Sequence, residues 1–284
     1  MKPLTAWYRN RAKRGEAKKT LTLDPIMPSA ALRRAYEKKM RELILPMIEE
    51  LQASLKAIPR KSQDQRARTY QEWVQTQPFH LREKYVSRFR RRSVEMARWF
   101  TVRANKNVKD QWRNNAEKYG LPTVGVDFSQ QLENNLAAIL EENVNLIRSI
   151  PEQYFDKIQD AVLKSQQAGN DLELLTKDIL KDGKVTKKRA EFIARDQNAK
   201  ATSFIARRRE LDLGIRQGVW MHSRAARHPR KSHVQADGKK FDLDKGMLLA
   251  DDKTGVKSYQ FPGQEINCGC THRPVIVVGG EEIY

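Results

Sequence analysis

Apolar residues recur at steps of three and four positions through most of the first 210 residues, and this periodicity constrains the fold more than any other feature. Such spacing places one apolar stripe along an amphipathic helix. It predicts helices over 30–58, 79–118, 128–149, 151–168, 171–182 and 185–210. We expect Pro46 to kink or break the first of these helices, a polar linker over 60–78, and a stop at Asp182-Gly183.

The pattern changes after Gly214. Residues 217–222 and 273–278 are typical of strands, and the segment between them is rich in turn residues. The predicted fold class is α+β, with long helices in the N-terminal two-thirds and a small, turn-rich, β-containing C-terminal domain. The predicted organisation is a basic flexible arm over 1–29, long basic helices facing DNA or a partner over 30–120, a helical core over 121–212, and a Cys/His-containing β-rich domain over 213–284.

The formal net charge of +19 points to the kind of partner. Nucleic acid is the first candidate, an acidic protein the second and an anionic membrane surface the third, while a generally basic soluble protein is the alternative. No run of 18 apolar residues occurs, so we expect no membrane-spanning helix. The first residues lack an apolar stretch after their charges, so we expect no secretory signal.

Basic side chains gather in three parts of the chain. The run from Arg88 to Arg92 lies in a predicted helix punctuated by aromatic residues, and two further groups lie near 187 and 208. Clustered cations at helical spacing suit phosphate contacts, although a solvated basic face with the aromatics in the core fits the same pattern. The candidate nucleic-acid-binding residues are Arg88, Arg90, Arg91, Arg92, Lys187, Lys188, Arg207, Arg208 and Arg209.

Cysteine and histidine concentrate near the C-terminus. Cys268 and Cys270 flank a single glycine, and thiolate and imidazole are ligands that zinc prefers. His233 is the first choice for a third ligand, and His272 is taken as the fourth, with His228 and His222 as alternatives. The candidate site is therefore a structural zinc held by His233, Cys268, Cys270 and His272. The alternative is a turn-rich domain in which the cysteines are buried apolar residues and His233 orders a loop through a hydrogen bond.

The C-terminal third also carries a series of short motifs in order. They are Val219-Trp220, Arg230-Lys231-Ser232-His233, Asp237-Gly238, Pro262-Gly263, Asn267-Cys268-Gly269-Cys270 and Arg273-Pro274-Val275-Ile276. Together with the upstream segment 189–197, this series resembles the phage Mu F-type minor head protein family, over residues 140–278. The expected structural motif residues are Trp220, Arg230, Asp237, Gly238, Pro262 and Gly263. Residues 223–228 hold no carboxylate, where the family often carries an Asp, which puts any role of that acid in doubt here.

The resemblance implies a minor capsid or head morphogenesis protein of a tailed phage rather than an enzyme. Its expected partners are portal, capsid and scaffold proteins, with packaged DNA as a nonspecific partner and no membrane. Its expected location is the virion, in the head interior or at the portal vertex, after assembly in the host cytoplasm. The alternative function is a metal-dependent nuclease or DNA-processing protein that uses the C-terminal His/Cys cluster. A toxin-like effector is a third reading, disfavoured because only residues 279–284 follow the last predicted strand.

Overall fold

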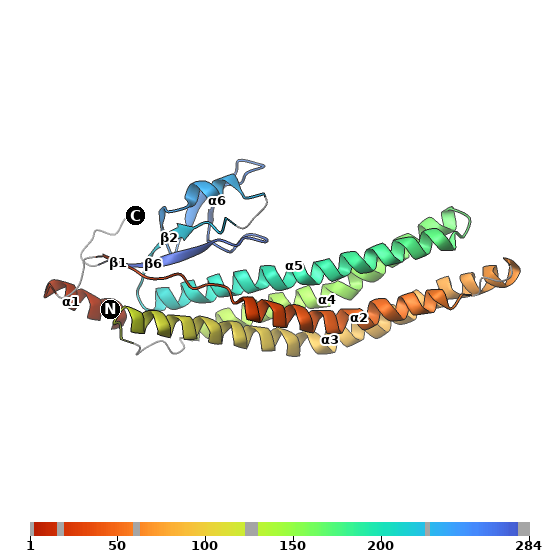
Figure 1. Ribbon diagram of the computed structural model, residues 1–284, viewed down its shortest axis with the longest axis horizontal. Helices are drawn as coiled ribbons and strands as arrows, with labels where there is room; N and C mark the ends of the chain where they lie inside the picture. Colours follow the sequence, from red (N-terminus) through yellow and green to blue (C-terminus); the bar gives the residue numbers. More distant parts are fainter. Residues whose placement is uncertain (1–2, 16–19, 59–62, 123–129, 225–227, 278–284) are drawn as a thin grey trace. The chain divides into compact units, whose positions relative to one another are not determined.

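The computed structural model describes residues 3–15, 20–58, 63–122, 130–224 and 228–277 of the chain (Figure 1). The described residues form five helices of 11 residues or more, one short helix and a small antiparallel β region. The helices are α1 (Pro3–Lys13), α2 (Ala30–Lys56), α3 (Gln63–Lys118), α4 (Gln130–Gln167), α5 (Leu172–Asp212) and α6 (Lys231–Ala236). The strands are β1 (Thr20–Thr22), β2 (Gln217–Met221), β3 (Lys240–Asp242), β4 (Met247–Ala250), β5 (Lys257–Gln260) and β6 (Thr271–Val277). The fold class is α+β, as predicted.

The chain divides into two compact units, each built from separate stretches of sequence. The first, here called the sheet unit, comprises Met1–Leu32, Thr101–Ile139 and Asp196–Tyr284. The second, here called the helical unit, comprises Arg33–Phe100 and Leu140–Arg195. Helices α3 and α5 therefore contribute to both units. None of the helices in the described part of the chain combines the length and apolar character needed to cross a bilayer.

The helical unit is a four-helix bundle of segments from α2, α3, α4 and α5, which run side by side in Figure 1. Interhelical contacts define the antiparallel order. Lys84 of α3 donates to Glu50 of α2 at 2.6 Å, and Arg82 of α3 pairs with Asp156 of α4 at 2.8 Å. Such charged contacts lie at the exposed rim of the bundle, where each contributes little to stability.

Burial of large apolar side chains between these helices stabilises the bundle. Tyr36, Tyr85, Phe89 and Phe100 are fully buried, and the rings of Tyr36 and Phe100 stack at 4.4 Å. Two tyrosine hydroxyl groups inside the bundle have partners, and that of Tyr70 forms a hydrogen bond of 2.8 Å with the Ser165 hydroxyl. The Tyr36 hydroxyl donates to Asn143 at 2.9 Å, so burial of its polar end carries no unpaired-group cost.

Helix α5 runs without interruption through Gly183, so the predicted stop at Asp182-Gly183 is wrong. The reason lies in packing. A Cβ on Gly183 would lie 3.0 Å from the Ile48 Cγ2 atom and 3.3 Å from the Gln52 side chain, so the glycine lets α5 approach α2 closely. The helical conformation of Gly183 costs about 1 kcal/mol relative to alanine, and tertiary packing offsets that cost.

Other parts of the chain also differ from the sequence-based prediction. Residues 63–78, expected to be a polar linker, form the first turns of α3 because Tyr70 and Trp73 bury their rings. Pro151, expected to start a helix, lies inside α4. Pro46 lies inside α2, which continues past it, so of the expected kink or break the break does not occur. Residues 3–13 form α1 although they belong to the expected flexible arm.

The sheet unit is organised around β6. The four strands lie in the order β1-β6-β2-β3, all neighbours being antiparallel, and β4 and β5 form a separate hairpin. Strand β1 comes from the N-terminal region, with Thr22 opposite Val275. The segment after β1 is fixed to α3, because the side-chain amide of Gln111 both accepts from and donates to the backbone of Met27 at 2.9 Å.

Replacement of Gly183 by leucine is expected to lower the free energy of unfolding by about 1–3 kcal/mol, because the added side chain must displace Ile48 and Gln52. Urea denaturation followed by circular dichroism measures the change. Lys184→Leu, at the exposed neighbouring position, is the matched control. Equal stability of the two variants would contradict the close approach of α5 to α2.

Candidate metal centre

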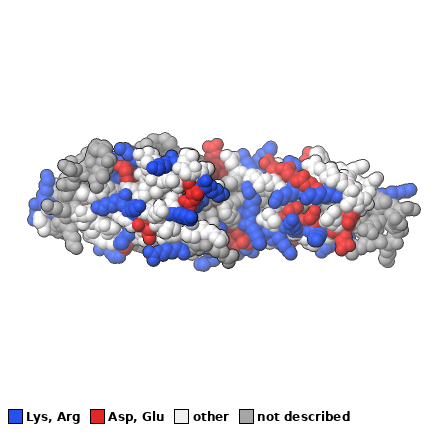
Figure 2. All heavy atoms as spheres, turned by 90° about the horizontal axis from the view of Figure 1, so that it is seen from above, with Lys and Arg blue, Asp and Glu red and all other residues white. Residues whose placement is uncertain are grey.

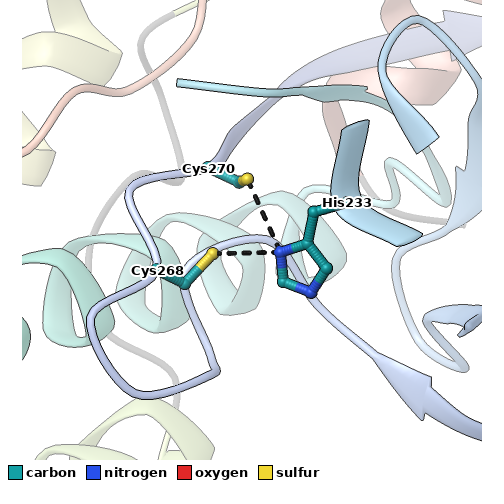
Figure 3. A group of neighbouring side chains, drawn as sticks. All are labelled: His233, Cys268 and Cys270. Atoms are coloured by element: carbon teal, nitrogen blue, oxygen red, sulfur yellow. Dashed lines mark hydrogen bonds between the residues drawn. The ribbon is translucent and has the colours of Figure 1, made fainter. Parts of the chain in front are cut away.

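Three side chains meet in the interior of the sheet unit (Figure 3). His233 lies on the short helix α6, and Cys268 and Cys270 lie in the loop that leads into β6. The His233 Nδ1 atom is 3.4 Å from the Cys268 sulfur and 3.7 Å from the Cys270 sulfur. All three ligand atoms lie within 4.8 Å of one another, and all three residues are buried. The sequence-based prediction of these three ligands agrees with this arrangement.

The separations suit one tetrahedral ion. Zinc bonds of about 2.3 Å to sulfur and 2.0–2.1 Å to nitrogen place two ligand atoms about 3.5–3.8 Å apart. The two imidazole–sulfur distances of 3.4 and 3.7 Å fall close to this range. The cluster of two thiols and one imidazole could therefore hold a metal ion, and its donor set is one that zinc favours.

Gln260 orients the imidazole ring. Its side-chain nitrogen donates to Ser258 Oγ at 3.2 Å, which leaves its oxygen to accept from His233 Nε2 at 3.1 Å. The ring proton then belongs on Nε2, and the Nδ1 lone pair faces the two sulfur atoms. A hydrogen bond to the far nitrogen is how metal-binding histidines are usually held. Gln260 carries no motif and was missed from the sequence.

Asp252 positions the helix that carries His233. Its carboxylate, in the β4–β5 hairpin, accepts from the backbone amides of Lys231 at 2.5 Å and Ser232 at 3.0 Å. These are unsatisfied donors of the first turn of α6, so the contact caps the helix from outside it. The amide hydrogen bonds oppose the effect of burial and keep the pKa of Asp252 below its usual value.

The loop carrying the cysteines is fixed to α5. The backbone amide of Asn267, which has a φ of +57°, donates to the buried carboxylate of Asp196 at 2.5 Å. Ser203 donates to the carbonyl of Pro262, and a Cβ on Gly263 would lie 2.9 Å from the Ser203 Cβ atom. The Pro-Gly step thus brings the loop against the helix, and only glycine fits there.

The two thiols are electrostatically unequal. A hydrogen bond from Cys270, opposed by burial and reinforced by His233, lowers the pKa of Cys268. The hydrogen bond to Cys268, together with burial, raises the pKa of Cys270. For His233, burial lowers the pKa, but the hydrogen bond and charge of Cys268 outweigh it and raise the net value. Cys268 is therefore the more readily deprotonated of the two thiols, and the thiolate is the form that binds cations.

His272, predicted as the fourth ligand, lies elsewhere. Its Nε2 atom is 2.5 Å from a carboxylate oxygen of Glu210, and both side chains are buried. Phe241 packs edge-on against the same imidazole. His222, an alternative ligand, accepts from the Arg224 amide at 3.2 Å, and His228 is exposed. Among the described residues, the cluster contains His233, Cys268 and Cys270 and no fourth side chain of a ligand type.

The expected motif residues join segments of the sheet unit, and Trp220 also contacts the cluster itself. Trp220 is fully buried on β2, with its ring 5.1 Å from that of His233. Asp237 accepts from the His222 amide at 2.9 Å, and the Gly238 amide donates to the Trp220 carbonyl at 2.9 Å. Arg230 donates to the carbonyl of Ile266 at 3.0 Å, just before the cysteine loop. These contacts make the motif a scaffold for the cluster.

The candidate nucleic-acid-binding residues are differently exposed. Arg90, Arg91, Arg92 and Lys188 are exposed, and Arg88, Lys187 and Arg208 are half-buried. Arg209 is only 3% exposed and donates to Asn105 at 2.7 Å, so its guanidinium serves the interior. Arg207 lies 3.7 Å from the Phe261 ring centroid and donates to the Leu243 carbonyl. Burial lowers the pKa of Arg207 to about 10.

Comparison with known proteins places this region in a family. Residues 156–273 match the sequence model of the family described as Phage Mu protein F like protein. The chain carries a domain of this family. The matched region begins within α4, includes all of α5 and both cysteines, and ends within β6. The resemblance inferred from the motifs is thereby confirmed for this part of the chain.

A relative in Haemophilus influenzae, described as an uncharacterized protein, is 35% identical over 161 residues. The alignment covers 54% of this chain and 33% of that protein, so it spans about a third of the relative's length. No solved structure matches the chain.

Protein purified without chelator is expected to contain about one zinc ion per chain, because the three ligands are preassembled and buried. Elemental analysis measures this content. Cobalt substitution should give a thiolate-to-cobalt charge-transfer band, and removal of the ion should lower the melting temperature.

Cys268→Ser and Cys270→Ser should each lose both the zinc and the charge-transfer band, whereas His228→Ala, at an exposed histidine outside the cluster, should retain them. A folded, metal-free wild-type protein that does not take up zinc or cobalt would refute the metal assignment. The cluster would then be a hydrogen-bonded group that only orders the loop.

Proposed function

We propose that this chain is a minor capsid protein, acting in head morphogenesis of a tailed phage, with a structural and assembly role. The observation that carries the proposal is the family match over 156–273, which coincides with the contiguous scaffold of α5, β2, α6 and β6 around the His/Cys cluster. The family suggests head morphogenesis and is generally structural rather than catalytic. The proposed partners are portal, capsid and scaffold proteins, and the proposed location is the head interior or portal vertex.

The buried cluster supports a structural rather than a hydrolytic role for a bound ion. His233 is 2% exposed and both cysteines are 4% exposed. A hydrolytic metal needs an open coordination position that substrate can reach and a base positioned to act on bound water. When bound, the ion would instead link α6 to the loop before β6 and stabilise the turn-rich segment between β2 and β6.

The proposal includes a nonspecific association with packaged DNA. On the face seen in Figure 2, Lys and Arg side chains are more frequent than Asp and Glu and are interspersed with them. In the helical unit, the exposed run Arg90-Arg91-Arg92 is the densest cationic segment, with Arg92 also paired to Glu95 at 2.8 Å. Exposed guanidinium groups on a rigid helix can contact phosphates without reading sequence.

Mass spectrometry of purified particles from a phage encoding this chain tests the head role. The chain is expected in the virion, at a few copies relative to the portal protein. Its absence from mature particles and from assembly intermediates would exclude the proposed role.

A plasmid-nicking assay with added divalent metals distinguishes the nuclease alternative, which requires nicking by wild-type protein that His233→Ala abolishes.

DNA affinity is expected to fall steeply with salt, because each phosphate contact releases counterions. Exchange of Arg90, Arg91 and Arg92 for glutamine should reduce the slope of log K against log salt by about 2–3. The matched control removes three exposed cations elsewhere on the helical unit, in Arg34→Gln, Lys38→Gln and Lys56→Gln. Equal losses in the two triple variants would show diffuse charge attraction rather than contact by the arginine run.

A further inference from the structure

The β4–β5 hairpin leaves one strand edge of the sheet unit unpaired. Among the described residues, β4 and β5 form a sheet with each other and with no further strand. Helix α6 packs against β4. Strand β5 is therefore the outer strand, and its residues Lys257, Ser258 and Tyr259 are all exposed. A free strand edge of this kind is a template for pairing with another chain.

The hydrogen bonds of the hairpin decide which residues face the free edge. The Asp251 amide donates to the Val256 carbonyl at 2.9 Å, so these two residues form a hydrogen-bonded pair. Such pairs alternate with non-hydrogen-bonded pairs along an antiparallel ladder. In the register of β4 and β5, Lys257 and Tyr259 therefore belong to non-hydrogen-bonded pairs. Their backbone N–H and C=O groups point away from β4, where another strand can reach them.

The outer face of the hairpin carries an apolar pair beside this edge. Ser258 and Gln260 bond to each other, and Gln260 also bonds to the imidazole of the cluster, so their side of β5 faces inward. Side chains alternate along a strand, so Lys257 and Tyr259 lie on the opposite side. There Tyr259, 59% exposed, lies across from Leu248 of β4, which is 51% exposed. A strand added at the free edge would extend this face.

We propose that β5 pairs antiparallel with β5 of a second copy of this chain, about a two-fold axis beside Ser258. This register sets the outward groups of Lys257 opposite those of Tyr259 in the second copy, and the reverse, so two hydrogen-bonded pairs form. The edge is thus self-complementary, as a two-fold interface requires. The two hairpins become one four-stranded sheet. This interface goes beyond the proposed head role and does not depend on it, because it rests on the hairpin alone.

Side-chain chemistry favours this register over the neighbouring ones. A two-fold axis at Lys257 would set two ammonium groups opposite each other, and like charges directly opposite are destabilising. An axis at Tyr259 would set Lys257 opposite Phe261, whose amide already donates to the Gln264 side chain at 3.0 Å. With the axis beside Ser258, each ammonium group lies across from an aromatic ring on the same face, which permits a cation–π contact.

The interface is small, so the association is expected to be weak. The net charge of +19 on each copy also opposes it. Salt screens this repulsion, so dimerisation should strengthen as the salt concentration rises. DNA binding should change in the opposite direction, which separates the two kinds of association.

Sedimentation velocity of the full chain over a range of concentrations measures the association. Lys257→Pro removes the amide that faces the free edge and no ladder bond within the hairpin, so it should weaken dimerisation about tenfold or more. Ala250→Pro makes the same change at the outward edge of β4 and should dimerise like the wild type. Melting temperatures confirm that both variants fold. Tyr259→Lys leaves the backbone intact, sets a second ammonium group opposite Lys257, and should also weaken the dimer.

Cross-linking tests the register. About the proposed axis, the two Ser258 Cα atoms form a non-hydrogen-bonded pair about 4.5 Å apart, within the range of a disulfide. The two Lys257 Cα atoms lie about 8 Å apart, beyond that range. Under mild oxidation, Ser258→Cys should therefore give a disulfide-linked dimer, whereas Lys257→Cys should not.

Three outcomes would overturn the proposal. A wild-type chain that stays monomeric at every concentration and salt would show that the edge is protected by Lys257 or left to a strand of another protein. Equal dimerisation of Lys257→Pro and Ala250→Pro would place the interface elsewhere. Cross-linking by Lys257→Cys as readily as by Ser258→Cys would refute the two-fold pairing beside Ser258.

Discussion

The C-terminal region depends on one face of α5. Four side chains on this helix, Asp196, Ser203, Arg207 and Glu210, follow one another at steps of seven, four and three residues, which aligns them on one face. Each bonds to a different point of the later chain, namely the Asn267 amide, the Pro262 carbonyl, the Leu243 carbonyl and the His272 imidazole. A turn-rich segment with little regular structure is thereby given a fixed course over a rigid helix. The family match over residues 156–273 spans this helix and most of the segment attached to it.

The His/Cys cluster adds a second constraint, because it joins α6 to the cysteine loop that α5 already holds. Gln260 and Asp252 both come from the β4–β5 region, so the hairpin orients the imidazole and caps its helix at once. An ion at this cluster would close the remaining freedom between α6 and the cysteine loop. The contribution of such an ion to stability is greatest where hydrophobic burial is least, as in a small, turn-rich region.

The sequence predicts those features that local periodicity controls and misses those that depend on tertiary packing. Apolar stripes located the long helices, and the short spacing of Cys268 and Cys270 predicted two members of the buried cluster that could hold a metal ion. In the sequence, Gly183 indicates the end of a helix. The glycine is explained by the close approach of Ile48, which belongs to another helix and cannot be seen in the local sequence. His272 was chosen by proximity to the cysteines along the chain, but residues alternate between the faces of β6, and its ring points to Glu210.

The charge pattern of the sequence has the same limit, because it does not show which cations the fold buries. Arg207, Arg208 and Arg209 form a basic run in sequence, yet the helix distributes them around its axis, and Arg209 bonds to Asn105 inside the unit. The Phe261 ring covers Arg207. The net charge of +19 therefore overstates the positive charge that is available to contact a polyanion. The exposed cations that remain include Arg90, Arg91 and Arg92 on α3, and Lys177, Lys181, Lys184 and Lys188 on one face of α5. Both groups belong to the helical unit, whereas Arg207 and Arg209 of the sheet unit donate to groups within that unit.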